Sequence, residues 1–452
     1  MESIQQIAEK FINKIMEVDI CEGMSKSLEK MQEIADEAIC RITEQKIEEM
    51  DEAIFRHANL RKNFVAERKE VPREVLTAHG MVRFRRRYYR NRYSGEHRYQ
   101  TDEFVGIEKG ERIEAGLVSR LCETAVDNSY AKSSRLCCKG EVSRQTVMRK
   151  TRKVENLKEL PVEARPGIRE IHIQADEDHV ALQDKRRSTI VKMVAIHESA
   201  EKVSSKRWRL PQRHLMSSYK EPVEDFWLRV ADEIERRYGG NEELRIYIHG
   251  DGAAWIRSGV KWLKNSYFVL DKFHVSRMIQ RLTGNDEGYG QYIWDQMAFD
   301  DRRNIHWMAQ ACVDTGICAP DTGEEFMQYI RNNWDGIRIW YDSNHHAGGS
   351  CAEGLVSHVL SSRLSSRPCG WMDDGLETIS RLRVYVLNGG RITPEHIRKS
   401  RKPSVRLTKQ LKSAMRMTER FEYAGPTASH ISHRNSPEYC LFNAISKGGH
   451  VI

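Results

Sequence analysis

The chain has 452 residues, of which 31% are charged and 39% hydrophobic, as in a globular protein of roughly two to four domains. No apolar stretch approaches the roughly 20 residues of a membrane-spanning helix, and the N-terminus lacks the order of a signal peptide, so we expect a cytoplasmic protein. None of the ten cysteines forms a Cys-x-x-Cys pair, which argues against a structural zinc site.

The net charge of +8 is distributed unevenly along the chain. Residues 1–60 hold 7 Lys and Arg against 14 Asp and Glu, a balance of −7. Residues 61–160 hold 24 against 14, a balance of +10, and residues 391–452 hold 12 against 4, a balance of +8. Basic charge concentrated in segments indicates a polyanionic partner. The last of these segments, 391–452, is predicted to be a basic C-terminal tail.

Residues 1–70 are predicted to be mainly helical. An amphipathic helix is expected over 3–16, and a longer one over 23–60. The second carries apolar residues at alternating spacings of four and three, which is the repeat of a coiled coil: Met24, Leu28, Met31, Ala35, Ala38 and Ile42. The helix either packs within its own domain or forms the seam of a dimer.

Residues 71–110 are predicted to form a basic β-hairpin, with strand-forming residues around Gly80, a turn at Ser94-Gly95 and a short second strand at 97–99. Arginines interleave with Tyr88, Tyr89 and Tyr93, a pattern suited to phosphate contacts and base stacking. The alternative is a solvated charged face. The predicted DNA contacts here are Arg83, Arg85, Arg86, Arg87, Arg90 and Arg92.

Residues 111–160 resemble a helix-turn-helix unit. Ser143 is a plausible N-cap for its third helix, which would run to Val154. That helix would present four side chains to a major groove: Arg144, Gln145, Arg149 and Lys150. A plain three-helix packing module is the competing interpretation.

Residues 168–282 and 346–390 are predicted to form an α/β core. Expected strands cover 169–182, 189–197, 207–214, 244–249 and 266–270, with helices at 222–238, 253–263 and from 271. Three consecutive strands followed by alternating helices and strands is the order of a ribonuclease-H-like mixed sheet. The tryptophan-rich segment 283–345 reads as an all-α insertion with its own core.

Three acids stand where elements of this core begin or end. Asp176 ends an apolar strand, Asp251 lies between Gly250 and Gly252 after another strand, and Glu353 lies early in a helix. Three convergent carboxylates can hold two Mg²⁺ ions, and two such ions can drive phosphodiester chemistry. Strand alternation makes Asp178 a competing ligand and turns Glu177 to the opposite face.

Four blocks of the core resemble the ISLre-type bacterial insertion-sequence transposases, a family formerly described as uncharacterised. They are Ile-Gln-Ala-Asp176-Glu-Asp, Ile-His-Gly-Asp251-Gly-Ala-Ala-Trp-Ile, Val-Leu-Asp271-Lys-Phe-His274, and the most specific, which runs from Cys351-Ala-Glu353 to Trp371. The resemblance covers nearly the whole chain. It implies a DDE transposase with a ribonuclease-H-like core and a helical insertion before the glutamate.

The resemblance also implies roles for particular residues. Asp176, Asp251 and Glu353 become the ligands of Mg²⁺, with Mn²⁺ as a substitute. His274, in a motif seen in related Mutator-like transposases, would lie near the scissile phosphate, and Arg367 would contact DNA after the Glu353 helix.

The expected partners are the terminal inverted repeats of the element and a target duplex, bound by a homodimer or higher oligomer associated with the nucleoid. The protein would cut DNA by hydrolysis and join the 3′-hydroxyl end to the target. Two alternatives stay open: a DNA-binding regulator derived from a transposase, and a metal-dependent nuclease without strand transfer.

Overall fold

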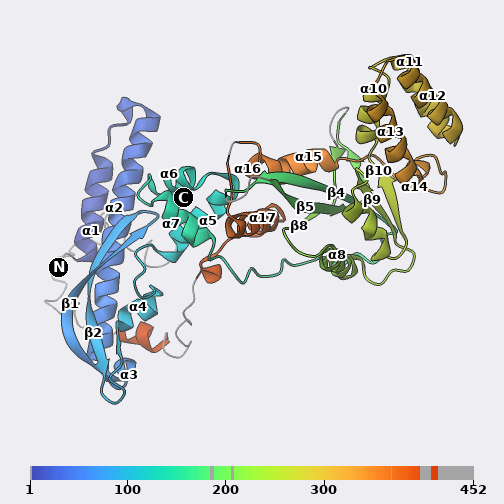
Figure 1. Cartoon of the computed structure of the whole chain (residues 1–452). Helices are drawn as coiled ribbons and strands as arrows, with labels where there is room; N and C mark the ends of the chain where they lie inside the picture. Colours follow the sequence, from blue (N-terminus) through green and yellow to red (C-terminus); the bar gives the residue numbers. More distant parts are fainter. Residues whose placement is uncertain are drawn as a thin grey trace. The chain divides into compact units, whose positions relative to one another are not determined.

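A computed structural model describes residues 3–183, 188–204, 208–345, 347–367, 369–397 and 409–415. They form a mixed α/β protein that divides into two compact units, residues 1–115 with 398–452 and residues 116–397 (Figure 1). No helix in the described ranges is both long and apolar enough to cross a membrane. Most of the expected basic tail, 391–452, lies outside the described residues.

The first unit begins with the two predicted helices. The hydroxyl of Ser3 accepts the Gln6 N–H and the Gln6 side chain accepts the Ser3 N–H, a reciprocal cap that starts the first helix. The elements of this unit are α1 (Ile4–Met16), η1 (Ile20–Glu22), α2 (Met24–Arg56), α3 (Ala58–Arg61), β1 (Phe64–Thr77), β2 (Gly80–Asn91), β3 (His97–Arg98) and α4 (Gln100–Val105).

The hairpin of this unit is longer than expected. β1 and β2 pair antiparallel and turn at Gly80, whose φ of 128° suits glycine. The Ser94-Gly95 turn instead joins β2 to the short β3. Residues 64–70, expected to be part of the helical segment, are the first half of β1.

Carboxylates of α2 close the outer edge of β2. Alternate backbone N–H groups of the strand donate to them at 2.7–3.0 Å: Arg83 to Glu44, Arg85 to Glu48, and Arg87 to Asp51. Satisfied edge N–H groups cannot recruit a further strand. Part of the acidic balance of residues 1–60 therefore serves the fold of the basic hairpin.

The second unit begins with the three predicted helices, α5 (Ala115–Asp127), α6 (Tyr130–Cys138) and α7 (Arg144–Thr151). Ser143 is the N-cap of α7, as expected, and its hydroxyl accepts the Thr146 N–H at 3.2 Å.

A five-stranded mixed sheet follows, in the order β10-β9-β4-β5-β8 (Figure 1). Its strands are β4 (Glu170–Ala181), β5 (Ser188–His197), β8 (His214–Ser218), β9 (Arg245–Gly250) and β10 (Ser266–Leu270). β5 is antiparallel to both β4 and β8, whereas β9 is parallel to both β4 and β10.

One expected strand was misplaced. Residues 207–214 do not form the third strand of the sheet, because β7 (Trp208–Arg209) pairs with β6 (Glu201–Lys202) in a small separate ribbon. Pro211 has no N–H to donate to a ladder, so the sheet strand starts only beyond it.

The two faces of the sheet carry different helices. On one face of the sheet, Ile171, Ile173 and Ala175 of β4 share a buried cluster with a first set of helices. On the other face, Val180 and Leu182 share a buried cluster with a second set. The first set comprises α8 (Val223–Tyr238), α9 (Ala254–Arg257), η2 (Ser258–Lys261), α10 (Lys272–Leu282), α11 (Glu287–Ala298), α12 (Arg302–Asp314), α13 (Pro320–Asn332) and α14 (Trp334–Arg338). The second comprises α15 (Ala352–Val356), the π-helical turn η3 (Ser357–Ser361), α16 (Ser362–Leu364) and α17 (Asp373–Leu387), and η4 (Pro394–His396) follows it.

The segment 283–345 is helical, as predicted, but it does not have a core of its own. Buried residues of α11 to α14, among them Phe326 and Ile337, belong to the same cluster as Ile173 of β4. The helices therefore extend the core of the sheet. They also cover the end of the sheet from which Asp251 emerges, because Tyr329 of α13 donates to the Asp251 carbonyl at 2.8 Å.

Candidate functional site

Asp176 and Asp251 lie where the pairing between two neighbouring parallel strands ends. β4 continues to Ala181 beside β5, so Asp176 does not end its strand as the sequence predicts, whereas Asp251 directly follows β9. Gln174 of β4 is paired with His249 of β9, and each aspartate lies two residues beyond its member of that pair. Because side chains alternate along a strand, the Asp176 carboxylate belongs to the face that carries Gln174, and Asp251 is the first residue after β9. The register of the sheet thus brings the two predicted metal ligands together.

The electrostatics of Asp176 agree with this placement. Burial raises the pKa of Asp176 to about 6; the Asp251 carboxylate adds to the rise, while the Glu177 N–H and His274 oppose it. Asp176, Asp251 and His274 are therefore close enough to influence one another. His274 lies in the first turn of α10, directly after β10.

The glycines on either side of Asp251 allow neighbouring elements to pack closely there. A Cβ at Gly250 would lie 2.8 Å from the Ile256 side chain and 3.0 Å from the Ala175 carbonyl. At Gly252, where φ is +98°, a Cβ would lie 2.5 Å from the amide oxygen of Asn333. Any larger residue would push apart the elements that hold the aspartate.

Gln174 ties the helix of Glu353 to β4. Its amide oxygen accepts the Cys351 N–H at 3.0 Å and lies 3.3 Å from the Ser350 hydroxyl oxygen. Glu353 is exposed on α15, two residues beyond this tie. The third predicted acid is therefore anchored to the strand that carries Asp176.

Asp271 links the same segment to α10. One carboxylate oxygen accepts the Ser350 hydroxyl at 3.1 Å, and the other accepts the Phe273 N–H at 2.9 Å, which caps α10 immediately before His274. Sequence reasoning missed the roles of Gln174 and Ser350. The one signal for Gln174 is its position two residues before Asp176 on the same strand face.

A buried row of histidines fixes the orientation of Gln174. The Gln174 amide nitrogen donates to His197 Nε2 at 3.1 Å, and His197 Nδ1 donates to the Glu198 carbonyl at 2.5 Å. His172 Nδ1 lies 3.1 Å from His249 Nε2. Burial lowers the pKa of all three histidines, that of His172 to about 4, so neutral rings lie beneath the acids. Because His197 takes the amide NH₂, the amide oxygen faces Cys351.

Asp178, the predicted competing ligand, is engaged by the fold through one carboxylate oxygen only, and its other oxygen is buried without a hydrogen-bond partner among the described residues. It is buried, and one of its oxygens accepts the hydroxyls of Ser361 and Ser365, each at 2.8 Å. It therefore holds the helical turns that follow Glu353. Glu177 points to the other face, as expected, where it accepts the Trp255 indole N–H at 2.6 Å.

The π-helical turn after Glu353 is braced by a buried arginine, Arg383 of α17. A π turn leaves carbonyls without their usual partners, and Arg383 donates to those of His358 and Val359. Arg383 also donates to the Val126 carbonyl at 3.1 Å, and Arg363 to the Ala125 carbonyl at 3.2 Å. The end of α5 is thereby joined to the segment that carries Glu353.

The donor set suits a hard cation, although the described side chains do not enclose one. Among the described residues, no three His, Cys, Asp or Glu side chains are arranged to hold a metal ion. Mg²⁺ needs few protein ligands, since one or two carboxylates with waters and substrate oxygens complete its shell. Asp176 and Asp251 could supply such a pair. The three-carboxylate site that includes Glu353 stays a prediction.

Two of the six hairpin arginines are engaged by the fold, which leaves them less suited to the predicted DNA contact. Arg86 is only 5% exposed; it lies 3.0 Å from the Asp102 carboxylate, with its guanidinium 3.7 Å from the centre of the Tyr99 ring. Arg87 pairs with Asp51 and Glu52 of α2, at 2.5 Å each. The carboxylates of α2 therefore neutralise a guanidinium group that the sequence of β2 alone assigned to DNA.

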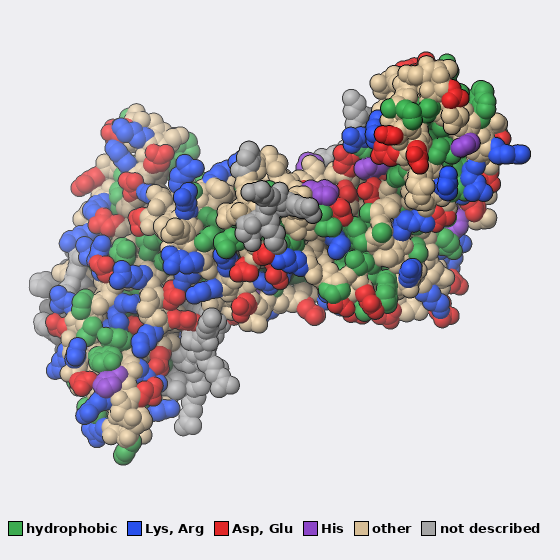
Figure 2. All heavy atoms as spheres, viewed as in Figure 1, with side chains coloured by type: hydrophobic (Ala, Val, Ile, Leu, Met, Phe, Trp, Pro, Cys, Tyr) green, Lys and Arg blue, Asp and Glu red, His purple; other side chains and the backbone are tan. Residues whose placement is uncertain are grey.

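The other four hairpin arginines are exposed. Arg83 pairs with Glu74 at 3.0 Å and Arg85 with Glu70 at 3.4 Å across the hairpin. Exposed pairs are weak, so a phosphate can displace the carboxylate. Arg90 and Arg92 are exposed near the end of β2. Figure 2 shows lysine and arginine side chains interleaved with acidic ones over the visible face of this unit.

The predicted recognition helix, α7, also has its polar and basic side chains at the protein surface. On α7, Arg144, Gln145 and Arg149 are exposed and Lys150 is half-buried, while Val147 packs inward. Arg367, predicted to follow the Glu353 helix as a DNA contact, is exposed as well. These positions stay predictions for DNA contact.

Comparison with known proteins gives a consistent set of relatives. A family model described as "Uncharacterised protein family (UPF0236)" matches residues 18–401. UPF0236 protein TTE2489 of Caldanaerobacter subterraneus subsp. tengcongensis is 33% identical over 422 residues, covering 92% of this chain and 89% of the relative. UPF0236 protein TTE0610/TTE0881/TTE1053/TTE2432 of the same organism is 32% identical over 422 residues, covering 92% and 88%. A third relative there, 33% identical over 401 residues with 87% and 85% covered, has a name that joins eleven locus designations.

Proposed function

Because the chain belongs to the UPF0236 family, whose relatives occur at several loci of one genome, we propose that it is a DDE-type DNA transposase. In this proposal it binds the terminal inverted repeats of its own element, cuts DNA by metal-assisted hydrolysis, and joins the exposed 3′-hydroxyl end to target DNA. A sequence repeated at many loci is what a mobile element leaves behind.

The strand arrangement supports a ribonuclease-H-like core. Three antiparallel strands that follow one another in the chain, β4, β5 and β8, occupy one side of the sheet. Two parallel strands, β9 and β10, complete the other side, and α8 lies between the two groups in the chain. This is the succession that the sequence pattern predicts for such a sheet.

The observation that carries the proposal is that Asp176 and Asp251 each lie two residues beyond the last pair of the neighbouring parallel strands β4 and β9, close enough for the Asp251 carboxylate to raise the pKa of Asp176. Mg²⁺ held there would activate the attacking hydroxyl and neutralise charge on the phosphate. Asp176 and Asp251 supply its anionic ligands, and Glu353 approaches from α15. In this proposal, His274 hydrogen-bonds a phosphate oxygen. Water and a DNA hydroxyl act as nucleophiles, so no covalent protein–DNA intermediate is expected.

The test is a joining assay with labelled duplexes that carry the inverted repeats flanking the gene, a target plasmid, and Mg²⁺ or Mn²⁺. We expect the wild type to give joined product and Asp251→Asn to give none, since this change keeps the shape but removes a ligand charge. Asp232→Asn, the same change at an exposed position of α8, is the matched control and should join normally.

Each failure has its own meaning. Unchanged product from Asp251→Asn removes that residue from the site. Binding of the repeats by the wild type without any cutting favours the DNA-binding regulator. Cut DNA that is never joined favours a metal-dependent nuclease.

A further inference from the structure

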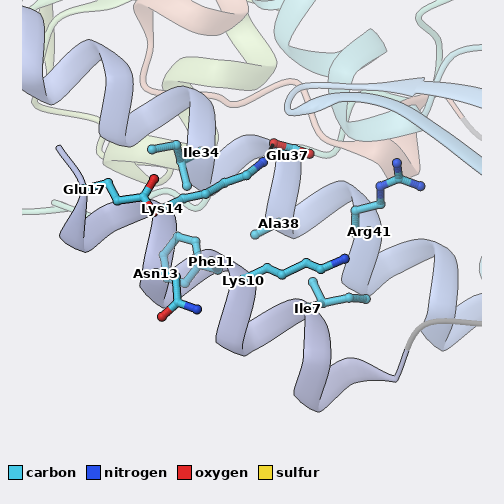
Figure 3. A pocket seen from close by; sticks show the side chains of 10 residues that line it. All are labelled: Ile7, Lys10, Phe11, Asn13, Lys14, Glu17, Ile34, Glu37, Ala38 and Arg41. Atoms are coloured by element: carbon cyan, nitrogen blue, oxygen red, sulfur yellow. Dashed lines mark hydrogen bonds and ion pairs between the residues drawn. The ribbon is translucent and has the colours of Figure 1, made fainter.

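The two helices that open the first unit pack against each other along one face. Ile7 is buried and Phe11 half-buried against α2, and the Lys14 ammonium lies 2.6 Å from the Glu37 carboxylate. Figure 3 shows the groove of about 460 Å³ that remains between α1 and α2, with side chains from both helices along it. Ala38 of the coiled-coil repeat lines this groove. The helix therefore packs partly within its own unit.

A second face of the same helices is apolar and exposed. Six large apolar side chains of α1, η1 and α2 are between 41% and 80% exposed: Ile12, Met16, Ile20, Met24, Leu28 and Ile39. No described residue covers them. A protein that stays monomeric rarely leaves so large an apolar area in water.

This face of α2 is also uncharged. The positions that share it from 24 to 42 are occupied by apolar side chains and one glutamine: Met24, Leu28, Met31, Gln32, Ala35, Ile39 and Ile42. Charged residues of α2 occupy other sides, where Glu22 pairs with Lys26 and Lys30. A face without charge offers nothing to a polyanion such as DNA. It can meet an identical face without repulsion between like charges.

We propose that this face, α2 from Met24 to Ile42 together with Ile12, Met16 and Ile20, is where a second copy of this chain binds. Apolar residues spaced by four and three form the seam at which one helix packs against another with the same repeat. The stretch of α2 is roughly 28 Å long at 1.5 Å per residue. Two copies of the α1–α2 hairpin would form a four-helix arrangement that buries both faces.

A two-fold interface suits the surface for another reason. It brings the same patch of each copy together, so the patch must be complementary to itself. Apolar side chains of similar size meet this condition, whereas a partner of opposite charge would find no matching charges here. The inference does not depend on the proposed DNA chemistry.

The experiment is light scattering of the full-length chain during gel filtration, without DNA, over a range of concentrations. We expect the wild type to have twice the chain mass of 52.6 kDa. The double variant Leu28→Glu/Ile39→Glu should have the single-chain mass, with a dissociation constant raised at least tenfold. Both residues are about half exposed, so helical content and melting temperature should stay unchanged.

Glu29→Arg is the control, because it changes charge beside Leu28 at an exposed position on another side of α2. It should leave the dimer intact. A wild type that stays monomeric at every concentration overturns the proposal, whatever else covers the face. A dimer that survives Leu28→Glu/Ile39→Glu also overturns it.

Discussion

Two clusters of charged side chains, one in each unit, are held in opposite ways. In residues 116–397, Asp176, Asp251 and Glu353 form no ion pair with any described residue. In the first unit, the arginines of β2 from 83 to 87 all pair with acids of β1, α2 or α4. A charge that the fold has satisfied stabilises the fold, whereas acids brought together without a cation are suited to binding one. Two unpaired acids beside the point where parallel strands stop pairing are therefore a stronger sign of function than a run of arginines.

The largest predicted effect is a loss of folding stability in the first unit, where the arginines are paired with acids. Arg86→Leu removes one partner of a buried ion pair and leaves Asp102 unpaired, which should lower the free energy of unfolding by about 3 kcal/mol. Urea denaturation measures it. Arg83→Leu, at an exposed pair, should cost less than about 1 kcal/mol. Equal losses from the two variants would contradict the distinction.

At the site of the unpaired acids in the second unit, Gln174→Leu should disturb the arrangement while leaving Asp176, Asp251 and Glu353 themselves unchanged. Loss of the contacts with Cys351, Ser350 and His197 frees the helix of Glu353, and groups that orient metal ligands are typically worth about 10–100-fold in metal affinity or activity. The joining rate and the Mn²⁺ affinity measure the effect. Gln310→Leu, at an exposed position of α12 whose amide, among the described residues, bonds only Asp314 of the same helix, is the control. Equal activity of both variants would show that the tie does not position Glu353.

Metal binding should depend on pH through Asp176. Its pKa is raised to about 6, so below that pH a proton competes with the cation. The apparent Mn²⁺ affinity should be flat above pH 7 and fall about tenfold for each pH unit below 6. Asp176→Asn should abolish this dependence along with tight binding. An affinity unchanged between pH 7 and 5 would mean that Asp176 is not a ligand.

The smallest predicted effect concerns the exposed arginines. Replacing Arg90 and Arg92 by alanine should weaken DNA binding. If each arginine contacts one phosphate, the plot of the logarithm of the DNA association constant against the logarithm of the salt concentration should become less steep by about 1.8. Fluorescence anisotropy at several salt concentrations gives the slope. Arg87→Ala, which removes an arginine already paired with α2, should leave the slope of the folded protein unchanged.

Local patterns predicted the parts of the fold that local physics controls. The cap at Ser143 and the alternation that separates Asp176 from Glu177 both follow from neighbouring residues. The order of the last two strands and their helices also followed from apolar runs.

Features that depend on distant partners were missed. Arg87 looked available because Asp51, 36 positions earlier, only becomes its partner when α2 packs on β2. The tie between Gln174 and Cys351 spans 177 positions and has no local pattern. The strand expected at 207–214 followed from β-forming residues, although Pro211 forbids a ladder there.

The central claim is that Asp176 and Asp251 share a divalent cation. Titration of the purified chain with Mn²⁺, followed by electron paramagnetic resonance at neutral pH, measures bound metal without requiring DNA or catalysis. The account predicts saturable binding by the wild type and by Asp232→Asn, and its loss in both Asp176→Asn and Asp251→Asn. Equal Mn²⁺ binding by the wild type and the two site variants would contradict it.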